Sequence, residues 1–189
     1  MSYTQVQICN LALTRMGANG HIQSLSEASE EAYSCSRLFD PTLRAALRMY
    51  AWGFATETDT LALLSETPDD YEYAYSLPSG CVRPLYILPK QDPPLAFEVR
   101  GNKLYTDVEE AVLKYTQYVD NPGMYDDAFV EAFSYRLAAD LALPLASDVA
   151  LQERMLGLAE RSVSAAKVAD AHQGKSVRSS HSDIVSARA

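Results

Sequence analysis

Apolar residues recur at helical spacing at the start of the chain. Thr4 to Gln7 match the Ser/Thr-x-x-Glu/Gln pattern of a capping box, in which side chains satisfy the first free backbone N–H groups. An apolar stripe follows, and Gly17 provides a stop signal. The pattern predicts a helix at about residues 4–17. The stripe comprises Val6, Cys9, Leu13 and Met16.

A second helix is predicted at about residues 27–52, with Ser24 or Ser26 as its cap. The pair Asp40-Pro41 lies inside it, and proline removes a backbone donor and clashes with the preceding turn. We therefore expect either a kink at Pro41 or a restart with Asp40 as N-cap. The apolar face comprises Ala32, Cys35, Leu38, Phe39, Leu43, Leu47 and Tyr50.

The apolar period changes to two in the middle of the chain. Large apolar residues alternate with polar or small ones from Tyr71 to Leu77, as in a half-buried strand. Gly101-Asn102 is a hairpin-compatible dipeptide between two further short runs. Five prolines keep these strands short and favour edge positions. The pattern predicts an antiparallel β-region at about residues 71–119.

Helical spacing then returns, and it predicts helices at about residues 126–143 and 148–171. Pro144 is expected to end the first of these helices, and Ser147 or Asp148 to cap the second. The expected fold class is α+β, mainly α: an antiparallel helical bundle with an inserted short-stranded antiparallel β-region and an extended C-terminal arm.

The end of the chain differs in composition from the rest. Residues 173–189 are small, polar and slightly basic, which is typical of a segment that does not fold alone. Ile184 and Val185, flanked by Asp183 and Arg188, resemble a short docking peptide. We expect one domain at residues 1–172, followed by a flexible docking arm.

The only tryptophan, Trp52, lies between the helical and the strand-like patterns, and Phe54 follows two residues later. Trp and Phe bury more apolar area than other residues. We therefore expect this pair to be a packing anchor that fixes how the two substructures meet, and not a binding box.

Composition narrows the class of protein. The chain has 189 residues, of which 48% are apolar, so it can bury a real core. No run approaches the roughly 18 to 20 apolar residues of a bilayer span, and the N-terminus lacks the pattern of a signal peptide. We expect a cytosolic chain without membrane contact. The net charge of -9 opposes a nucleic-acid reader, although a conduit for sliding DNA stays compatible.

Candidate chemistry is sparse. Three scattered cysteines are better explained as core residues than as a disulfide framework or a zinc site. The histidines fall in a predicted loop and in the tail, so they are better explained as polar surface residues. The side chains of adjacent acidic residues diverge on a helix or a strand, so solvated faces, turns and helix starts explain the acidic pairs better than a pair of catalytic carboxylates does. We expect no catalytic residue, metal or cofactor. The residues concerned are Cys9, Cys35, Cys81, His21, His172, His181, Glu30-Glu31, Asp69-Asp70, Glu109-Glu110 and Asp126-Asp127.

Arg136 and Asp140 stand four residues apart on a predicted helix whose other faces are apolar. They form either an ordinary ion pair, within the helix or between helices, or a contact between subunits.

A series of motifs runs through nearly the whole chain: Ile8-Cys9-Asn10-Leu11-Ala12-Leu13 with Met16-Gly17, Ile22-x-Ser24-Leu25, Ala32, Cys35, Leu47, Trp52-x-Phe54-Ala55, Tyr75-x-Leu77-Pro78, Gly101-x-x-Leu104-Tyr105-Thr106-Asp107, Tyr115, Leu137-Ala138-Ala139 and Asp183-Ile184-Val185-x-Ala187-Arg188. Their order and spacing resemble the tail tubular protein A family, the head-to-tail adaptors of short-tailed bacteriophages. Pro41 departs from the family pattern.

The resemblance implies a structural protein of the virion that is assembled in the host cytoplasm. Related adaptors form a ring of twelve copies between the portal protein and the tail nozzle protein, and DNA passes through this ring during ejection. An acidic subunit fits such a channel because it repels phosphates within a screening length of roughly 10 Å. No sequence-specific binding of DNA is expected.

Two contact surfaces follow from this role. We expect the arm to dock on the portal through Ile184, Val185 and Arg188. The tail-side contact is expected on the sheet, since exposed strands and tyrosines suit protein interfaces; alternatively, these tyrosines cover the sheet core. The tyrosines are Tyr71, Tyr73, Tyr75 and Tyr105.

Two other classes of function stay open. A tail-associated cell-envelope hydrolase would require the acidic pairs to converge. A non-catalytic helical interaction module from a prophage would function without a phage tail as its partner.

Overall fold

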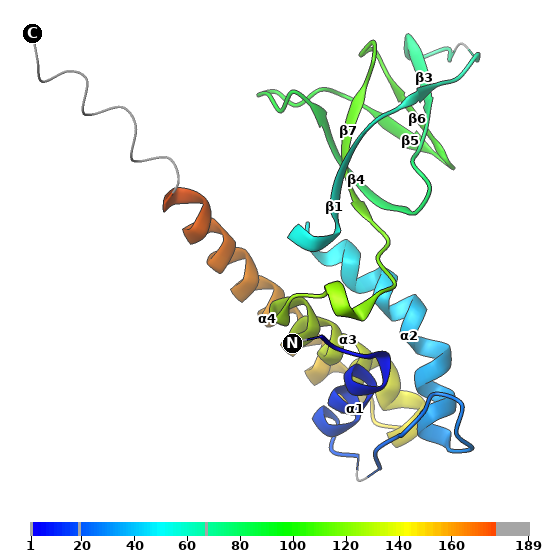
Figure 1. Cartoon of the computed structure of the whole chain (residues 1–189), viewed down its shortest axis with the longest axis vertical. Helices are drawn as coiled ribbons and strands as arrows, with labels where there is room; N and C mark the ends of the chain where they lie inside the picture. Colours follow the sequence, from blue (N-terminus) through cyan, green and yellow to red (C-terminus); the bar gives the residue numbers. More distant parts are fainter. Residues whose placement is uncertain (1, 19, 67, 177–189) are drawn as a thin grey trace, which may run out of the picture. The chain divides into compact units, whose positions relative to one another are not determined.

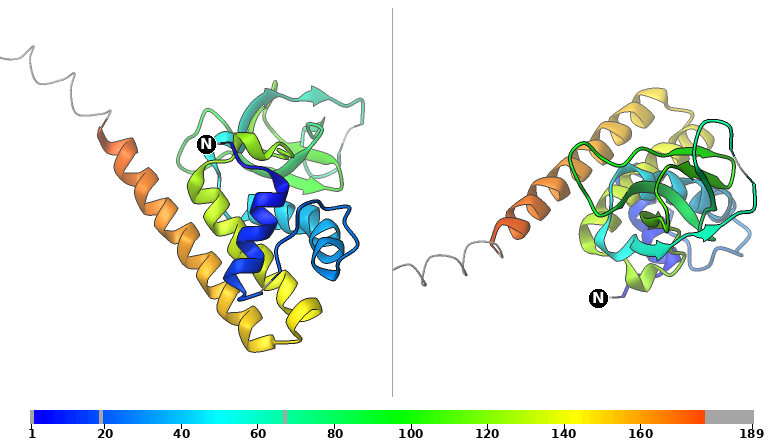
Figure 2. Two further views of the ribbon diagram at one scale, coloured as in Figure 1. Left: turned by 60° about the horizontal axis from the view of Figure 1, so that its bottom comes forward. Right: turned by 90° about the horizontal axis from the view of Figure 1, so that it is seen from above.

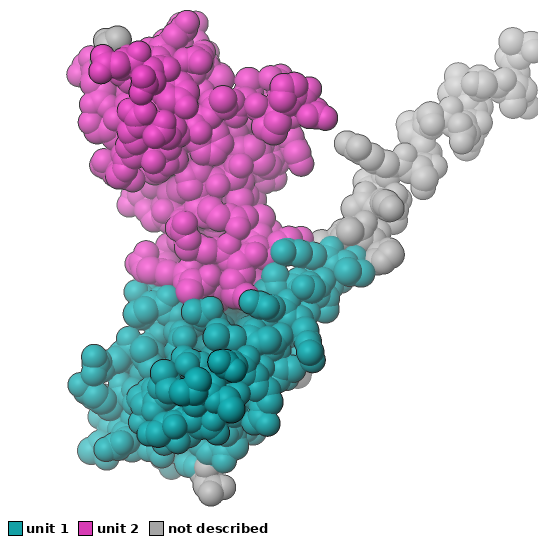
Figure 3. Space-filling model, turned by 180° about the vertical axis from the view of Figure 1, so that it is seen from behind, with its two compact units in different colours: residues 1–42, 125–189 teal, residues 43–124 magenta. Residues whose placement is uncertain are grey.

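The computed structural model describes residues 2–18, 20–66 and 68–176, with side chains up to residue 169. The chain divides into two compact units (Figure 3): a helical unit, Met1–Thr42 with Tyr125–Ala189, and a sheet unit, Leu43–Met124. The described part contains four α-helices and two small antiparallel sheets. The expected α+β class is therefore confirmed.

The helical unit contains α1 (Gln5–Arg15), α3 (Asp127–Ala146), α4 (Val149–Ser176) and the first part of α2 (Glu30–Met49), which continues into the sheet unit along the chain (Figure 1). Helix α3 packs beside both α1 and α4 (Figure 2). The predicted capping box of α1 is confirmed: the backbone N–H of Gln7 donates to Thr4 Oγ1 at 3.2 Å, and the Thr4 N–H donates to Gln7 Oε1 at 2.9 Å.

Helix α2 begins later than predicted, and its cap is Ser29. The Ser29 hydroxyl accepts from the N–H of Ala32 at 3.2 Å. The expected caps Ser24 and Ser26 instead contact each other, with 2.8 Å between their hydroxyl oxygens. The Glu27 carboxylate accepts from the N–H groups of residues 23 and 24, which holds these serines in a turn outside the helix.

Both internal prolines are tolerated within helices. Helix α2 runs through Pro41, so of the two alternatives that the sequence left open, the restart at Asp40 is wrong. Helix α3 likewise continues past Pro144, the predicted stop, and ends at a left-handed Ser147 with φ 51°. A proline costs a helix one hydrogen bond, and each of these helices also buries apolar residues, which contribute stability of the opposite sign.

Helix α4 is longer than predicted at its C-terminal end. Of the two expected caps, Asp148 takes the role: its carboxylate accepts from the N–H of Leu151 at 2.9 Å. The helix continues to Ser176, so residues 173–176, predicted to belong to the arm, are helical.

Aromatic rings fill the core of the helical unit. Phe39 meets Phe133 edge to face at 5.1 Å between ring centroids, and Phe129 stacks on Phe133 at 5.5 Å. Cys9 and Cys35 are fully buried, as expected for small core side chains, and Cys81 of the sheet unit is partly buried.

The sheet unit contains β1 (Thr56–Thr60), β2 (Ala62–Leu63), β3 (Tyr73–Ser76), β4 (Cys81–Leu88), β5 (Glu98–Arg100), β6 (Lys103–Thr106) and β7 (Val112–Gln117), with short 3-10 turns at Gly53–Ala55 and Pro122–Met124. One sheet has the order β1-β7-β4 and the other β2-β3-β6-β5. The predicted hairpin joins β5 and β6, with Gly101 at φ 64° in the turn.

The sheets begin earlier than the predicted boundary at Tyr71. Strand β1 consists of alternating threonines and acidic residues and is largely exposed. It pairs with β7 on one side only, as an edge strand. An edge strand exposed on both faces has no apolar alternation, so hydrophobic periodicity does not detect it.

A compact apolar core supports the sheet unit. Residues from four of its seven strands and from two connections contribute to it. Its fully or nearly fully buried members are Leu61, Tyr75, Ile87, Leu104, Ala111, Leu113 and Tyr115.

Candidate interaction surfaces

Trp52 is a buried residue of the sheet unit. It is only 2% exposed, its Nε1 donates to the carbonyl oxygen of Ala46 at 3.1 Å, and its ring meets that of Tyr50 edge to face at 5.2 Å. Phe54 is partly buried in the turn that follows. Trp52 thus closes the end of α2 inside its unit, while its predicted role between two substructures stays a prediction.

Two arginines tie the same end of α2 to strand β4. Arg48 Nη1 donates to the carbonyl oxygen of Val82 at 2.5 Å, and Arg83 Nη1 donates to the carbonyl oxygen of Arg48 at 2.6 Å. The sequence does not predict this reciprocal contact, because the spacing of charges does not show which backbone carbonyl groups lie within reach of an arginine.

The four tyrosines of the predicted tail-side surface have different environments. Tyr75 is 2% exposed, and its hydroxyl donates to the carbonyl oxygen of Val108 at 2.9 Å. Tyr71, Tyr73 and Tyr105 are partly buried. For Tyr75 the structure shows the core position considered as the alternative, and only the other three retain accessible surface.

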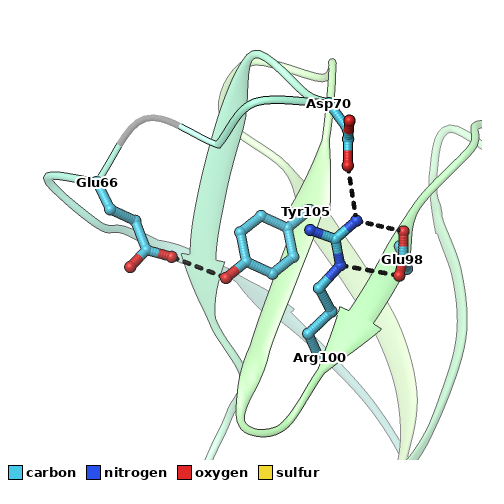
Figure 4. A network of polar contacts seen from close by, with 5 residues as sticks. All are labelled: Glu66, Asp70, Glu98, Arg100 and Tyr105. Atoms are coloured by element: carbon cyan, nitrogen blue, oxygen red, sulfur yellow. Dashed lines mark hydrogen bonds and ion pairs between the residues drawn. The ribbon is translucent and has the colours of Figure 1, made fainter.

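Tyr105 belongs to a polar network on the outside of the sheet unit (Figure 4). Its hydroxyl donates to Glu66 Oε1 at 2.9 Å, and Lys103 pairs with the same carboxylate. Arg100 pairs with Glu98 at 2.9 Å and with Asp70 at 3.0 Å. The network connects strands β5 and β6 to the chain segment before β3.

The electrostatics of this network follow from its hydrogen bonds. The pKa of Glu66 is lowered, first by the hydrogen bond from Lys103 and then by that from Tyr105. The same bond to Glu66 raises the pKa of Tyr105. These groups are exposed to solvent, which screens their attraction, so the network orders the surface more than it stabilises the fold.

Arg136 and Asp140 are brought together within α3. Arg136 Nε lies 3.6 Å from Asp140 Oδ2, and the same carboxylate oxygen accepts from the Thr42 hydroxyl at 2.6 Å. This is the ion pair within a helix that the spacing allowed. A contact with another subunit stays a prediction.

Asp140 also lines a hollow of about 830 Å³ in the helical unit, between the start of α2 and the end of α3. Tyr33 and Leu143 line it and are 62% and 43% exposed. The pattern of apolar residues in the sequence does not predict this hollow. Its one signal was Tyr33, a large aromatic residue that lies off the apolar stripe of its helix.

The adjacent acidic residues lie at helix starts and in turns, each within its own unit. The pair Glu30-Glu31 opens α2, Asp126 caps α3 by accepting from the N–H of Phe129 at 2.6 Å, and Glu109-Glu110 lies in a turn. Among the described residues, no three His, Cys, Asp or Glu side chains gather in a way that could hold a metal ion. None of the helices in the described part is both long and apolar enough to span a membrane.

The residues expected to dock on the portal, Ile184, Val185 and Arg188, lie outside the described residues. Neither the scan against protein-family models nor the search of curated proteins found a match to this chain.

Proposed function

We propose that the chain is a structural head-to-tail adaptor of a bacteriophage, which forms a ring between the portal protein and the tail nozzle protein and lines the DNA exit channel. One observation carries the proposal: the sequence motifs that resemble the tail tubular protein A family coincide with successive helices and strands of the fold. The motifs include residues of α1, of α2 and of the 3-10 turn after it, of β3, β6 and β7, and of α3.

The organisation of the chain supports this role. The resemblance implies a helical bundle with an inserted β-region, and the sheet unit is inserted in the sequence between helical segments of the other unit. The insertion begins within α2. Such an organisation provides two kinds of surface in one subunit, as an adaptor with different partners at its two ends requires.

The charge of the chain also suits the role. A net charge of -9 disfavours adhesion of phosphates. A ring of such subunits would let DNA pass without holding it. The many arms of a ring would also bind a portal by multivalency, although each arm alone would bind weakly.

Electron microscopy tests the proposal directly. The purified chain is mixed with the portal protein encoded in the same genome, and particles are classified with and without the chain. We expect an additional ring on the portal, which then binds the nozzle protein. A portal that gains no density would contradict the proposal. Release of peptidoglycan fragments by the chain, lost on replacement of specific carboxylates, would favour the hydrolase.

A truncation tests the arm. Because α4 extends to Ser176, removal of residues 177–189 leaves the described helices intact. We expect the truncated chain to keep its far-UV circular dichroism spectrum and to lose portal binding. Ser179→Ala with Ser180→Ala is the matched control, since it alters the arm but leaves its apolar and charged residues. Unchanged portal binding by the truncated chain would refute this assignment of the arm.

A further inference from the structure

The hollow between α2 and α3 has a neighbour in the helical unit. A second hollow of about 400 Å³ adjoins it and shares Glu30 as a lining residue. Together they follow the first turns of α2 and the last turns of α3, and we name them the α2–α3 groove. The lining of the groove includes the charged and exposed apolar residues Glu27, Glu30, Glu31, Tyr33, Arg37, Asp140 and Leu143.

The groove is acidic. It is lined by the carboxylates of Glu27, Glu30, Glu31 and Asp140, and Arg37 provides the single guanidinium of the lining. Asp140 is paired with Arg136, and Glu27 accepts from backbone N–H groups, so Glu30 and Glu31 carry most of the attraction for a basic occupant. The C-terminal end of α3, which carries the negative end of the helix dipole, lies along the same groove. These charges favour an occupant with basic side chains.

The groove also has an apolar side. Tyr33 and Leu143 are among the most exposed large hydrophobic residues of the described chain, at 62% and 43%, and both face the same hollow. Arg37 Nη1 donates to the Tyr33 hydroxyl at 3.3 Å, and its guanidinium lies 5.3 Å from the centre of the Tyr33 ring. Arg37 thus holds the ring in place and leaves one positive group for an acidic residue of the occupant.

We propose that the α2–α3 groove binds residues 177–189 of a second copy of this chain. That segment carries adjacent aliphatic residues, Ile184 and Val185, together with two arginines and one aspartate. The arginines match the carboxylates, the aspartate matches Arg37, and the aliphatic pair matches Tyr33 and Leu143.

Chain length explains why the segment comes from another copy. Helix α4 begins three residues after the end of α3, so its first turn lies beside the groove. Its 28 residues carry Ser176 about 40 Å away, at 1.5 Å per residue. Ile184 follows eight residues later and reaches back about 28 Å at most, even when fully extended. A copy therefore cannot fill its own groove, and each copy docks on the next, head to tail.

The inference does not depend on the adaptor role, because groove and segment belong to the same chain and no portal is required. It assigns the segment a binding site in the absence of the portal.

Self-association of the full chain tests the inference. Sedimentation velocity is measured up to about 1 mM, where weak contacts are populated. We expect concentration-dependent association, with an association constant that is at least tenfold lower for Leu143→Lys. This variant adds a positive charge at a helix C-terminus, which does not disfavour the helix. Val168→Lys is the matched control, because Val168 is 58% exposed on α4 outside the groove. Tyr33→Ala is a second groove variant, in case the first does not fold.

A mixing experiment identifies the two halves of the contact. The double variant Ile184→Asp with Val185→Asp is expected to abolish association alone, as is Leu143→Lys. A mixture of the two variants retains one intact groove and one intact segment, so we expect it to form dimers that do not grow further. A monomeric full chain, association unaffected by both variants, or a mixture that stays monomeric would each overturn the inference. Portal binding by the full chain, measured separately, tests the adaptor role independently.

Discussion

The two units bury their apolar residues in different ways. In the helical unit, ten residues of α3 are buried, on more than one face, so this helix forms the centre of its unit. In the sheet unit, β1 is largely exposed and β5 entirely so, and burial concentrates on the strands between the edges. We therefore expect substitutions of buried residues to cost more stability in α3 than in the sheet strands, because atoms packed on several sides can adjust less around a cavity.

The surfaces of the units differ as well. The sheet unit exposes charges that are already paired with each other, as in the network of Arg100 and Glu66. The helical unit exposes an acidic groove in which the large apolar residues Tyr33 and Leu143 are 62% and 43% exposed. Charges that are already paired suit a weak, specific contact with another protein, whereas a groove with exposed apolar residues suits the binding of an inserted chain segment.

The largest loss is expected for the anchor of the sheet unit. Trp52→Ala should lower the free energy of unfolding by about 3–5 kcal/mol, because the indole is buried and the Ala46 carbonyl loses its donor. Urea denaturation followed by far-UV circular dichroism measures this loss. Tyr50→Phe is the control, since it retains the ring that contacts Trp52. A loss below about 1 kcal/mol would mean that Trp52 is not part of a packed core.

The same substitution in both units tests the difference in packing. Leu137 of α3 and Leu113 of β7 are both fully buried. We expect Leu137→Ala to cost about 3–4 kcal/mol and Leu113→Ala about 2–3 kcal/mol, because the thinner sheet can collapse partly around the cavity. Chemical denaturation of both variants under one condition provides the comparison. Equal losses, or a larger loss at Leu113, would contradict it.

A hydroxyl at the rim of the sheet core should have a smaller, pH-dependent effect. The Tyr115 hydroxyl donates to Asp59 at 2.6 Å, and Tyr115→Phe should cost about 1–2 kcal/mol at neutral pH. Burial, and then the bond to Asp59, raise the pKa of Tyr115 above its usual value of 10.0. The folded chain therefore holds this proton more tightly than the unfolded chain, so the stabilisation is complete below about pH 10 and is lost as pH rises further.

Unfolding measured between pH 8 and 11 checks this sign. Stability of the unmodified chain should fall more steeply above pH 10 than that of Tyr115→Phe. Parallel curves would show that Tyr115 does not contribute to the pH dependence.

The smallest effect is expected at the surface network. Glu66→Gln removes a charge that is exposed to solvent, so the urea midpoint at neutral pH should not shift measurably. The lowered pKa of Glu66 means that any contribution is present above the usual pKa of a glutamate and disappears in acid. A clear loss of stability in this variant at neutral pH would show that the network stabilises the sheet unit and does more than order its surface.

Local signals predicted several elements well. The capping box of α1 and the hairpin at Gly101 depend on neighbouring residues, and both form as expected. The predicted stripe of α2 supplies buried residues at Ala32, Cys35 and Phe39. Strands β1 and β2 were not predicted, because an exposed edge strand needs no apolar alternation and is selected by pairing with a distant partner.

The prolines show the limit of local reasoning. Pro41 and Pro144 are strong stop signals in a sequence, yet α2 and α3 continue through them. The cost of one missing hydrogen bond is local, whereas the burial that offsets it comes from packing between elements.

By itself, the sequence determined the class of the fold, the buried cysteines and the place of Trp52 between the two patterns, because these depend on periodicity and on the area of each side chain. Only the tertiary structure decided that Tyr75 is a core residue, that Asp140 binds Thr42, and that Tyr33 and Leu143 face one groove. The reason is physical: a period assigns a residue to a face, whereas its partners depend on which distant elements pack against that face.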